Sequence, residues 1–453
     1  MELKDKNVLV AGSGKSGISA ANLLKKVEAN VTIYDGNESL EKEFVLSKLN
    51  DKSNVEVILG ELPAKVIQNT DLMILSPGIA IDAPFVNAVR NAGVPIWGEI
   101  ELAYVVGKGK IAAITGTNGK TTTTALAGEI LAAYYEDVKV VGNIGTPYTQ
   151  TAFNSTDDTV TVAEISSFQL ETIHTFQPNV SAVLNITPDH LNRHYTMECY
   201  TDVKMDITKN QPKNAPVILN YEDDILREYA PKLHNKIIWF SSKRKLEEGI
   251  YLDGKNIIYA VGSDKQIVTT IEDTTLVGIH NTENIMAAIG IAMNMGVPAE
   301  TIKEAIRNFK AVEHRIEYVD TIEDVIYYND SKGTNTDASV KAIQAMSRPT
   351  ILIAGGYDKK VSFDDWAKEL EGKIKCLVLL GETAGQIADA VRKYGYDNII
   401  FTHSLEEAVQ VCYDKAVSGD AVLLSPACAS WDMFDCYEQR GDMFKEFVKK
   451  LKK

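Results

Sequence analysis

The fold of this chain is decided by the stretch Ile111-Ala112-Ala113-Ile114-Thr115-Gly116-Thr117-Asn118-Gly119-Lys120-Thr121-Thr122. Its apolar first half predicts a buried strand, and the glycine turn leads into a helical pattern, which is the setting of a phosphate-binding loop. Glycines let backbone N–H groups converge on phosphate oxygens at the positive end of a helix, while the Lys120 ammonium adds charge and the Thr121 hydroxyl suits Mg²⁺. Ile114 stands where the common motif has its first glycine, so the loop is a shortened form. A glycine turn with an ordinary helix-start lysine is the alternative.

Short apolar runs alternate with helical patterns on both sides of this loop, which predicts a parallel α/β architecture. The predicted buried strands cover residues 7–11, 31–34, 55–59, 72–75, 94–97, 110–115, 159–163, 180–185, 216–220, 325–329, 350–354, 376–380, 399–401 and 421–425. Between residues 237 and 277, short strands and glycines predict an antiparallel insertion. A helix pair at residues 281–295 and 299–308 follows it.

A chain of 453 residues is too long for one ordinary domain. One strand series ends near Gly98, and a third series begins after residue 312. The sequence therefore predicts three α/β domains, at residues 1–98, 99–312 and 313–453.

Composition and charge limit the partners of the protein. Hydrophobic residues make up 45% of the chain and charged residues 24%, as in folded globular proteins. Because 47 Lys and Arg stand against 62 Asp and Glu, the net charge of −15 disfavours nucleic acid and anionic lipid surfaces. There is no signal-peptide pattern and no apolar run of roughly 18 residues, so we expect a cytoplasmic protein without a membrane partner. The five scattered cysteines predict free, buried thiols rather than disulfides or a zinc site.

A second glycine turn, Gly12-Ser13-Gly14-Lys15-Ser16-Gly17, follows the first predicted strand, and Asp35 ends the second. In such an arrangement a diphosphate can approach the backbone at a helix N-terminus while the acidic residue accepts hydrogen bonds from ribose or base. The pattern predicts a nucleotide diphosphate without specifying nicotinamide. An oxidoreductase is one alternative, although it leaves residues 116–122 without a role. A purely structural turn is another.

Polar side chains also follow other predicted strands. Asn143, Glu164 and His190 stand at strand ends, where the carboxyl ends of parallel strands form a ligand crevice. The carboxylate of Glu164 suits Mg²⁺, but a structural role for Glu164, paired with another side chain, is an equally good alternative. His190 could also be structural, because an isolated histidine is more often structural than a ligand. Lysines and hydroxyls gather in three later loops, at residues 329–335, 355–359 and 425–431. If these loops converge, they suit a small anionic substrate.

Longer motifs resemble those of the Mur ligase family along the whole chain. The motifs similar to the family's ATP site, which folylpolyglutamate synthase shares, are residues 116–122, 280–288 and 313–315. The motifs similar to the member that adds D-glutamate are residues 76–79, 329–335, 424–430 and 437–441. The resemblance implies an ATP-dependent amide ligase that adds D-glutamate to UDP-N-acetylmuramoyl-L-alanine through an acyl phosphate, in peptidoglycan precursor synthesis. Family members that add other amino acids, folylpolyglutamate synthase and a non-catalytic nucleotide-sensing module stay alternatives.

The same resemblance implies a role for each of the three domains. Residues 1–98 would form a Rossmann-like domain for the UDP-sugar precursor. Residues 99–312 would form a P-loop ATPase-type domain, whose parallel sheet carries a small antiparallel subsheet. Residues 313–453 would form a dinucleotide-fold-like domain that holds the amino acid and closes over ATP. We expect a monomer, with hinges near Gly98 and Ala311.

The resemblance also implies roles for single residues. The catalytic residues would be Lys120, Glu164, His190 and Lys204. ATP would be bound by Gly116, Thr117, Asn118, Gly119, Lys120, Thr121, Thr122, Asn281, Asn284, Arg315 and Asp330. The UDP substrate would be bound by Gly12, Ser13, Gly14, Lys15, Ser16, Gly17, Asp35, Ser76, Gly78, Asn143, Ser166 and His190. D-glutamate would be bound by Lys332, Thr334, Lys359, Ser430 and Tyr437. The ligands of two Mg²⁺ ions would be Thr121, Glu164, His190 and Lys204.

Lys204 would act as a carbamate, and only the family pattern marks it. The residue pattern by itself predicts an exposed helical segment with a surface lysine at residues 200–204. A carbamate would turn the cation into an anionic oxygen ligand that suits Mg²⁺. Two positions depart from the family pattern: Tyr437 stands where some members have Phe, and Lys15 with Ser16 replaces an apolar residue followed by a hydroxyl residue.

Overall fold

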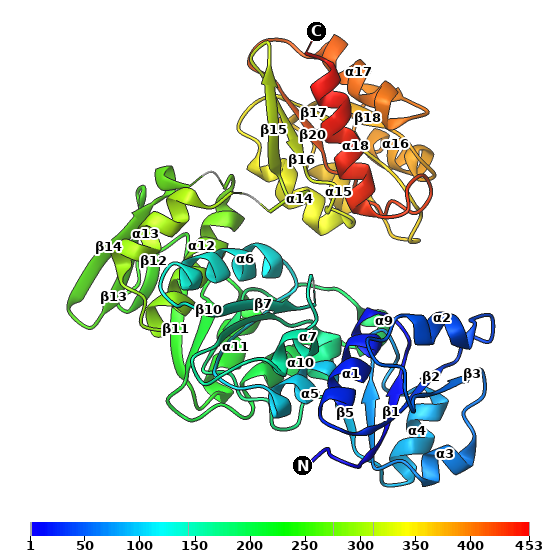
Figure 1. Ribbon diagram of the computed structural model, residues 1–453. Coiled ribbons are helices and arrows are strands. Elements are labelled where there is room, and N and C mark those ends of the chain that lie inside the picture. Colours follow the sequence, from blue (N-terminus) through cyan, green and yellow to red (C-terminus); the bar gives the residue numbers. More distant parts are fainter. Residues whose placement is uncertain (1, 144, 275, 311, 453) are drawn as a thin grey trace. The chain divides into compact units, whose positions relative to one another are not determined.

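The structure is a computed structural model that describes residues 2–143, 145–274, 276–310 and 312–452 (Figure 1). Within these residues the strands form three sheets, which confirms the predicted α/β class. Contacts divide the chain into two units, the first made of Met1–Asp273 and Glu283–Asn308 and the second of Thr274–Thr282 and Phe309–Lys453. The first unit holds two sheets and the second unit holds the third.

The first sheet is parallel and has the strand order β3-β2-β1-β4-β5. Its strands are β1 (Asn7–Ala11), β2 (Asn30–Asp35), β3 (Glu56–Leu59), β4 (Leu72–Leu75) and β5 (Ile96–Gly98). Its helices are α1 (Lys15–Lys26), α2 (Lys42–Ser47), α3 (Ala64–Gln68) and α4 (Pro84–Asn91). The strand order reverses between β1 and β4, so the loops after these strands diverge and leave a crevice at the carboxyl edge.

The second sheet has the order β14-β13-β12-β11-β10-β9-β6-β8-β7. Its parallel strands are β6 (Lys110–Thr115), β7 (Val138–Gly142), β8 (Val160–Glu164), β9 (Val180–Val183), β10 (Pro216–Asn220) and β11 (Lys236–Ser241). Its antiparallel part contains β12 (Gly249–Asp253), β13 (Asn256–Val261) and β14 (Asp264–Thr270). Because β12 also pairs with β11, the predicted antiparallel insertion continues the edge of the main sheet. The order reverses around β6, so the loop after β6 opens at a ligand crevice.

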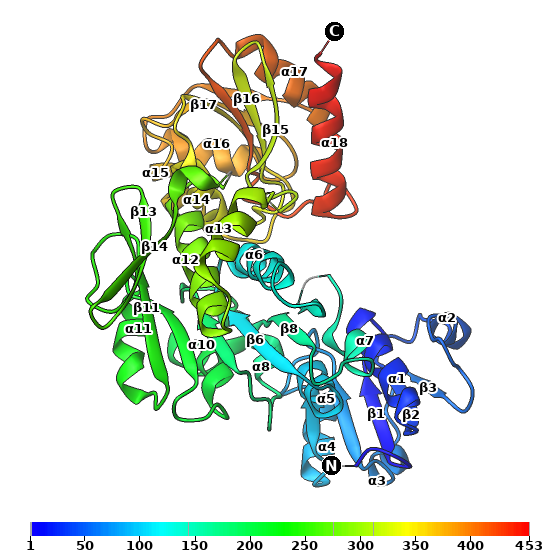
Figure 2. The same cartoon turned by 60° about the vertical axis from the view of Figure 1, so that its left-hand side comes forward.

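Helices connect the first two sheets into one unit. Those of the second sheet are α5 (Glu99–Val106), α6 (Lys120–Ala132), α7 (Tyr148–Ala152), α8 (Ser167–Leu170), α9 (Leu191–His194), α10 (Met197–Met205), α11 (Asp224–Tyr229), α12 (Ile279–Asn294) and α13 (Ala299–Asn308). Both α1 and α5 pack against α7, and α6 packs against α13 (Figure 2). The predicted hinge position Gly98 lies inside this unit, where its amide donates to the Thr172 carbonyl oxygen at 3.2 Å. The other hinge position, Ala311, lies outside the described residues.

The third sheet has the order β15-β16-β20-β17-β18-β19 and is parallel except for β15. Its strands are β15 (Glu317–Ile322), β16 (Val325–Asn329), β17 (Thr350–Ala354), β18 (Ile374–Leu379), β19 (Ile399–Phe401) and β20 (Ala421–Leu424). Its helices are α14 (Thr336–Ala345), α15 (Asp364–Lys368), α16 (Ala384–Arg392), α17 (Leu405–Lys415) and α18 (Tyr437–Lys450). The carboxyl ends of β16, β20 and β17 are adjacent, which brings the loops after these strands together.

The cysteines are free, as predicted, but they are not all buried. Cys376, Cys412 and Cys428 are buried, Cys436 is partly buried and Cys199 is exposed. The buried residues of α10 include Tyr200 and Lys204, so Cys199 falls on the opposite, outer face of this helix. Among the described residues, no helix is long and apolar enough to cross a membrane.

Candidate active site

The turn between β6 and α6 depends on two glycines. Gly116 and Gly119 adopt φ angles of +147° and +86°, in the region that favours glycine. A Cβ atom on Gly119 would collide with Oδ1 of Asn284 on α12. The Lys120 ammonium donates to the carbonyl oxygens of Gly116 and Thr117, each at 2.9 Å. The structure therefore sets a lysine over a glycine turn at a helix N-terminus, which is an arrangement suited to phosphate.

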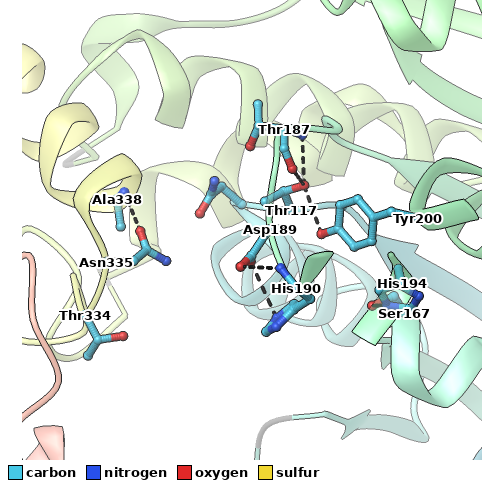
Figure 3. A network of polar contacts seen from close by, with 12 residues as sticks. Thr117, Ser167, Thr187, Asp189, His190, His194, Tyr200, Thr334, Asn335 and Ala338 are labelled. Carbon is cyan, nitrogen blue, oxygen red and sulfur yellow. Dashed lines mark hydrogen bonds and ion pairs between the residues drawn. The ribbon is translucent and has the colours of Figure 1, made fainter. Parts of the chain in front are cut away.

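Two side chains of α10 contact the same turn. Tyr200 and Lys204 are four residues apart, so they share a face of the helix. The Tyr200 hydroxyl lies 3.2 Å from the Thr117 hydroxyl (Figure 3), and the Lys204 ammonium donates to the Gly116 carbonyl oxygen at 2.8 Å. Lys204 is only 2% exposed, so the surface position predicted from the residue pattern is wrong. The face of α10 that carries Lys204 is turned toward the phosphate loop.

The environment of Lys204 disfavours its charged form. Burial lowers the pKa of this lysine well below its usual value, and the nearby charge of Lys120 lowers the pKa further. Asp189 acts in the opposite direction without outweighing them. At neutral pH the fraction of Lys204 present as the neutral, nucleophilic amine is therefore larger than that of an exposed lysine.

Glu164 ends β8 next to the phosphate loop. It is 2% exposed and pairs in register with Ile114 of β6. The side-chain amide of Asn143 donates through Nδ2 to Oε1 of Glu164 at 3.1 Å. Ser166, two residues further along, begins α8, and its hydroxyl accepts from the Gln169 amide at 3.3 Å in a capping box. The structure thus brings Asn143 and Glu164 together, while Ser166 caps a helix close by in sequence.

His190 and His194 lie at the two ends of α9 in different environments. His190 is half exposed, with Nε2 3.5 Å from Oδ2 of Asp189 (Figure 3). Its ring centroid lies 4.8 Å from that of Phe168. His194 is buried, with Nε2 3.0 Å from the Ser167 hydroxyl. Burial lowers the pKa of His194 to about 4, so this imidazole is neutral at physiological pH. Of the two histidines, His190 is the one that a ligand can reach.

The predicted metal ligands combine a hydroxyl, a carboxylate, an imidazole and a lysine. In the part of the chain that the structure describes, no three His, Cys, Asp or Glu side chains form a group able to hold a metal ion. Mg²⁺ prefers oxygen donors, which Thr121 and Glu164 supply. The buried amine of Lys204 would add anionic oxygens as a carbamate, and with them the donor chemistry fits Mg²⁺.

The glycine turn after β1 stands against Asp35 at the end of β2. The amide and hydroxyl of Ser13 both donate to Oδ2 of Asp35, at 2.9 and 2.6 Å. Partial burial raises the pKa of Asp35, but hydrogen bonds from Ser13 and Asn37 outweigh it and leave the pKa below its usual value. A Cβ atom on Gly17 would collide with the carbonyl oxygen of Gly12, so helix and turn pack without room for a side chain. Asp35 therefore stays an anionic hydrogen-bond acceptor beside a glycine turn whose backbone a phosphate group can approach.

Residues on two further loops complete this crevice. The Ser76 hydroxyl, directly after β4, is buried and has no hydrogen-bond partner within the described residues. A Cβ atom on Gly12 would meet this hydroxyl at 2.6 Å. Gly78 lies in the same turn and is exposed. The Lys15 ammonium reaches across to the carbonyl oxygen of Gly145. A cavity of about 400 Å³ adjoins Ser13, Gly14 and Lys15.

In the second unit, the predicted ATP residues include a buried carboxyl group, that of Asp330. Asp330 follows β16 and accepts hydrogen bonds from the Ser425 hydroxyl at 2.7 Å and the Ile316 amide at 3.3 Å. Burial raises the pKa of Asp330 to about 7. Nε of Arg315 is buried and has no partner among the described residues, which leaves a donor for a ligand. Asn281 is buried and donates to the Val277 carbonyl oxygen at 2.7 Å.

The predicted D-glutamate residues form two neighbouring groups at the carboxyl edge of the third sheet. The Lys359 ammonium donates to the Thr334 carbonyl oxygen at 3.3 Å and lies 5.6 Å from the ring of Trp431, which follows the buried Ser430. The Lys332 ammonium lies 5.6 Å from the ring of Tyr437. Four of the five predicted residues therefore stand on loops after β16, β17 and β20, and Tyr437 is the first residue of α18.

Arg440 ties these loops together, and sequence reasoning did not assign it a role. It is 2% exposed and donates to the carbonyl oxygens of Ser331 and Cys428, at 2.9 and 3.2 Å. Its place inside the motif at residues 437–441 was the only signal in the sequence. Tyr200 was missed for a different reason, because a tyrosine in a helical pattern carries no chemical signal of its own.

Three protein-family models together match most of the chain. Residues 6–98 match "Mur ligase MurD-like, N-terminal domain", residues 114–292 match "Mur ligase middle domain", and residues 314–428 match "Mur ligase, glutamate ligase domain". The chain belongs to the Mur ligase family. Its membership extends over all three sheets.

Curated Mur ligases match the chain over its full length. A UDP-N-acetylmuramoylalanine–D-glutamate ligase of Lachnospira eligens is 54% identical over 451 residues, with 100% of both chains covered. The ligase of the same name from Clostridioides difficile is 46% identical, again with 100% of both chains covered. Among solved structures, the UDP-N-acetylmuramate–alanine ligase MurC of Thermotoga maritima matches 99% of this chain and 100% of its own with a TM-score of 0.61. At 18% identity, this likeness shows the shared fold.

Proposed function

We propose that this Mur ligase joins D-glutamate to UDP-N-acetylmuramoyl-L-alanine at the expense of ATP, in a reaction that depends on Mg²⁺. The observation that carries this proposal is the 54% full-length identity with a ligase of that name. The two glycine turns support it from the structure. One stands beside an anionic acceptor, Asp35, and the other lies under Lys120. A dehydrogenase would need only the first turn.

The chemistry requires that a carboxylate be activated before an amine can attack it, because the leaving group would otherwise be oxide. The alanyl carboxylate of the UDP substrate attacks the γ-phosphate of ATP, and an acyl phosphate and ADP result. The neutral amine of D-glutamate then attacks the acyl carbon through a tetrahedral intermediate, and phosphate leaves. The product is an amide that serves as a peptidoglycan precursor. Magnesium ions, when bound, would neutralise charge on the transferring phosphoryl group.

Within this reaction Lys120 neutralises phosphate charge from the glycine turn, with backbone amides of residues 116–122 around it. Asn284 borders the turn and is assigned to ATP, as are Asn281, Arg315 and Asp330 of the second unit. The turn at residues 12–17, Asp35, Ser76, Gly78, Asn143, Ser166 and His190 are assigned to the UDP substrate. Lys332, Thr334, Lys359, Ser430 and Tyr437 are assigned to D-glutamate. The corresponding domains are residues 1–98, 99–312 and 313–453.

Two Mg²⁺ ions would be held by Thr121, Glu164, His190 and a carbamate on Lys204. The burial of Lys204 and its lowered pKa support the modification, because only a neutral amine attacks carbon dioxide. The amine nitrogen forms a bond to the carbon of CO₂, a proton is released, and an anionic carbamate remains. Nuclear magnetic resonance with ¹³C-labelled bicarbonate should show a carbamate signal that is absent from Lys204→Ala. An identical spectrum for both proteins would contradict the modification.

Phosphate release from ATP tests the proposed function directly. With Mg²⁺ present, release should require both UDP-N-acetylmuramoyl-L-alanine and D-glutamate, and mass spectrometry should find the new amide. A panel with L-glutamate, L-alanine and diaminopimelate in place of D-glutamate separates this activity from those of other family members. A higher rate with any of these amino acids would contradict the assignment.

A further inference from the structure

Arg193 on α9 connects two parts of the first unit that lie far apart in sequence. Its Nε and Nη2 bind the two carboxylate oxygens of Glu171 at 3.2 and 2.5 Å. Its Nη1 and Nη2 also donate to the carbonyl oxygens of Pro77 and Ile79, at 3.0 and 2.9 Å. The side chains of Arg193 and Glu171 are only 13% and 8% exposed. A charged pair so well shielded, with both ends hydrogen-bonded, is far more rigid than a surface ion pair.

The same guanidinium also lies over an aromatic ring. Its central carbon is 4.3 Å from the centroid of the Phe168 ring, and the centroid of the His190 ring is 4.8 Å from that of Phe168. The backbone of Arg193 also donates to the carbonyl oxygen of His190 at 2.9 Å. Arg193 is therefore fixed to His190 through the main chain and through Phe168.

The turn that Arg193 holds at its other end carries Ser76 and Gly78. This turn closes on itself through the Ile79 amide, which donates to the Ser76 carbonyl oxygen at 3.0 Å. The buried Ser76 hydroxyl lies against the glycine turn after β1 and has no partner among the described residues. A displacement of this turn would move that hydroxyl relative to the diphosphate crevice.

We propose that Arg193 is a positioning residue for the UDP substrate. Its side chain keeps the turn of Ser76 and Gly78 at a fixed position relative to His190. This inference rests on the proposed function, because both ends of the link are assigned there to the UDP substrate. A lysine could not replace the arginine, since one ammonium group cannot bind a carboxylate in bidentate fashion, reach two carbonyl oxygens and stack on a ring together.

Steady-state kinetics of Arg193→Lys test this role. We expect the KM for the UDP substrate to rise about tenfold, while the KM for ATP stays within about twofold, because the described hydrogen bonds and ring contact of the arginine side chain join it to Glu171, Pro77, Ile79 and Phe168, outside the phosphate loop. Glu171→Gln should raise the same KM by a smaller factor, and it serves as the test if Arg193→Lys fails to fold. The double variant should be no worse than Arg193→Lys if the two residues act as one unit.

Tyr195→Phe is the matched control. The Tyr195 hydroxyl donates to the Asp82 carboxylate at 2.6 Å and thus links the same two parts of the chain, but it is exposed, and the hydrogen bonds and ring contacts described for it include neither Phe168 nor Glu171. Its kinetics should equal those of the wild type. A similar rise in KM for Tyr195→Phe would mean that the loss of any link between these two parts of the chain weakens substrate binding. That result would overturn a specific role of Arg193.

Two further results would overturn the inference. One is an unchanged KM for the UDP substrate in a folded Arg193→Lys protein, and the other is an equal rise in the KM values for ATP, D-glutamate and the UDP substrate. Calorimetric titration of the UDP substrate alone reports on Arg193 even in the absence of turnover. A wild-type protein that binds this substrate but forms no amide would refute the proposed function. In that case, the affinities of the wild type and of Arg193→Lys for the UDP substrate would still test the role of Arg193.

Discussion

Two lysines donate to one backbone carbonyl, that of Gly116, from different elements. Lys120 does so from the start of α6 and Lys204 from the buried face of α10. Two ammonium groups placed this close repel each other, and burial lowers the pKa of Lys204, which favours its neutral form. At the residue scale, the same side-chain type therefore offers a cation for phosphate in one position and a reactive amine in the other.

Lys120→Ala should lower kcat by at least about a hundredfold, because in the proposed mechanism it removes a charge that faces the transferring phosphoryl group. Binding of the UDP substrate, measured by calorimetry, should change less than about twofold, since we assign this substrate to the other glycine turn. Lys139→Ala, at a partly buried lysine paired with Asp137, is the control and should leave kcat unchanged. Turnover of Lys120→Ala near the wild-type rate would contradict the role of Lys120.

Asp330 makes stability depend on pH in a direction opposite to that of most carboxyl groups. Its pKa is raised to about 7 in the folded protein by burial, so its contribution is complete below its unfolded pKa of about 4 and is lost as pH rises toward 7. Relative to Asp330→Asn, the wild type should lose up to about 4 kcal/mol of unfolding free energy over this range. Urea denaturation of both proteins from pH 4 to 8 measures this, and a pH-independent difference would contradict it.

At the element scale, α5 is held by a carboxylate rather than by apolar contacts alone. Glu101 on α5 is fully buried and accepts hydrogen bonds from the amides of His174, Thr175 and Phe176, at 2.7 to 3.0 Å. α5 also packs against α7, which connects the helices of the two sheets. The carboxylate thus fixes the segment that follows Gly98.

Glu101→Gln should lower the free energy of unfolding by about 2–3 kcal/mol, because the amide nitrogen of glutamine cannot accept the backbone hydrogen bonds and meets a donor instead. Thermal denaturation should show this as a lower Tm. Glu129→Gln, on the exposed face of α6, is the control and should change the Tm little. Equal Tm values for Glu101→Gln and the wild type would show that α5 does not depend on this carboxylate.

At the scale of the whole molecule, the acyl phosphate must be protected from water until the amine arrives. We therefore expect the domains to close when the nucleotide and both cosubstrates are bound. Small-angle X-ray scattering should show a smaller radius of gyration with a non-hydrolysable ATP analogue, the UDP substrate and D-glutamate than with no ligand. An unchanged radius of gyration under saturating conditions would contradict this closure. The hinges at Gly98 and Ala311 stay predictions.

The predicted strands recur in the structure where both faces of a strand are buried. Every residue of β4 and β9 is buried, and such short apolar runs are visible in a sequence. The strands β7 and β15 were missed, because both lie at sheet edges and mix exposed with buried side chains. Edge strands lack the continuous apolar pattern on which the prediction depends.

The parallel α/β class and the two glycine turns follow from the residues alone, because buried strands and positive φ angles restrict residue types within a few positions. The folded chain was needed to reveal that Lys204 is buried against Gly116, that Arg193 reaches Pro77, and that Arg440 joins two loops. The contacts of Lys204 with Gly116, of Arg193 with Pro77 and of Arg440 with Ser331 join residues 88, 116 and 109 positions apart. Long polar side chains have no local preference that reveals such partners, since their burial is compensated only by groups that the completed fold brings to them.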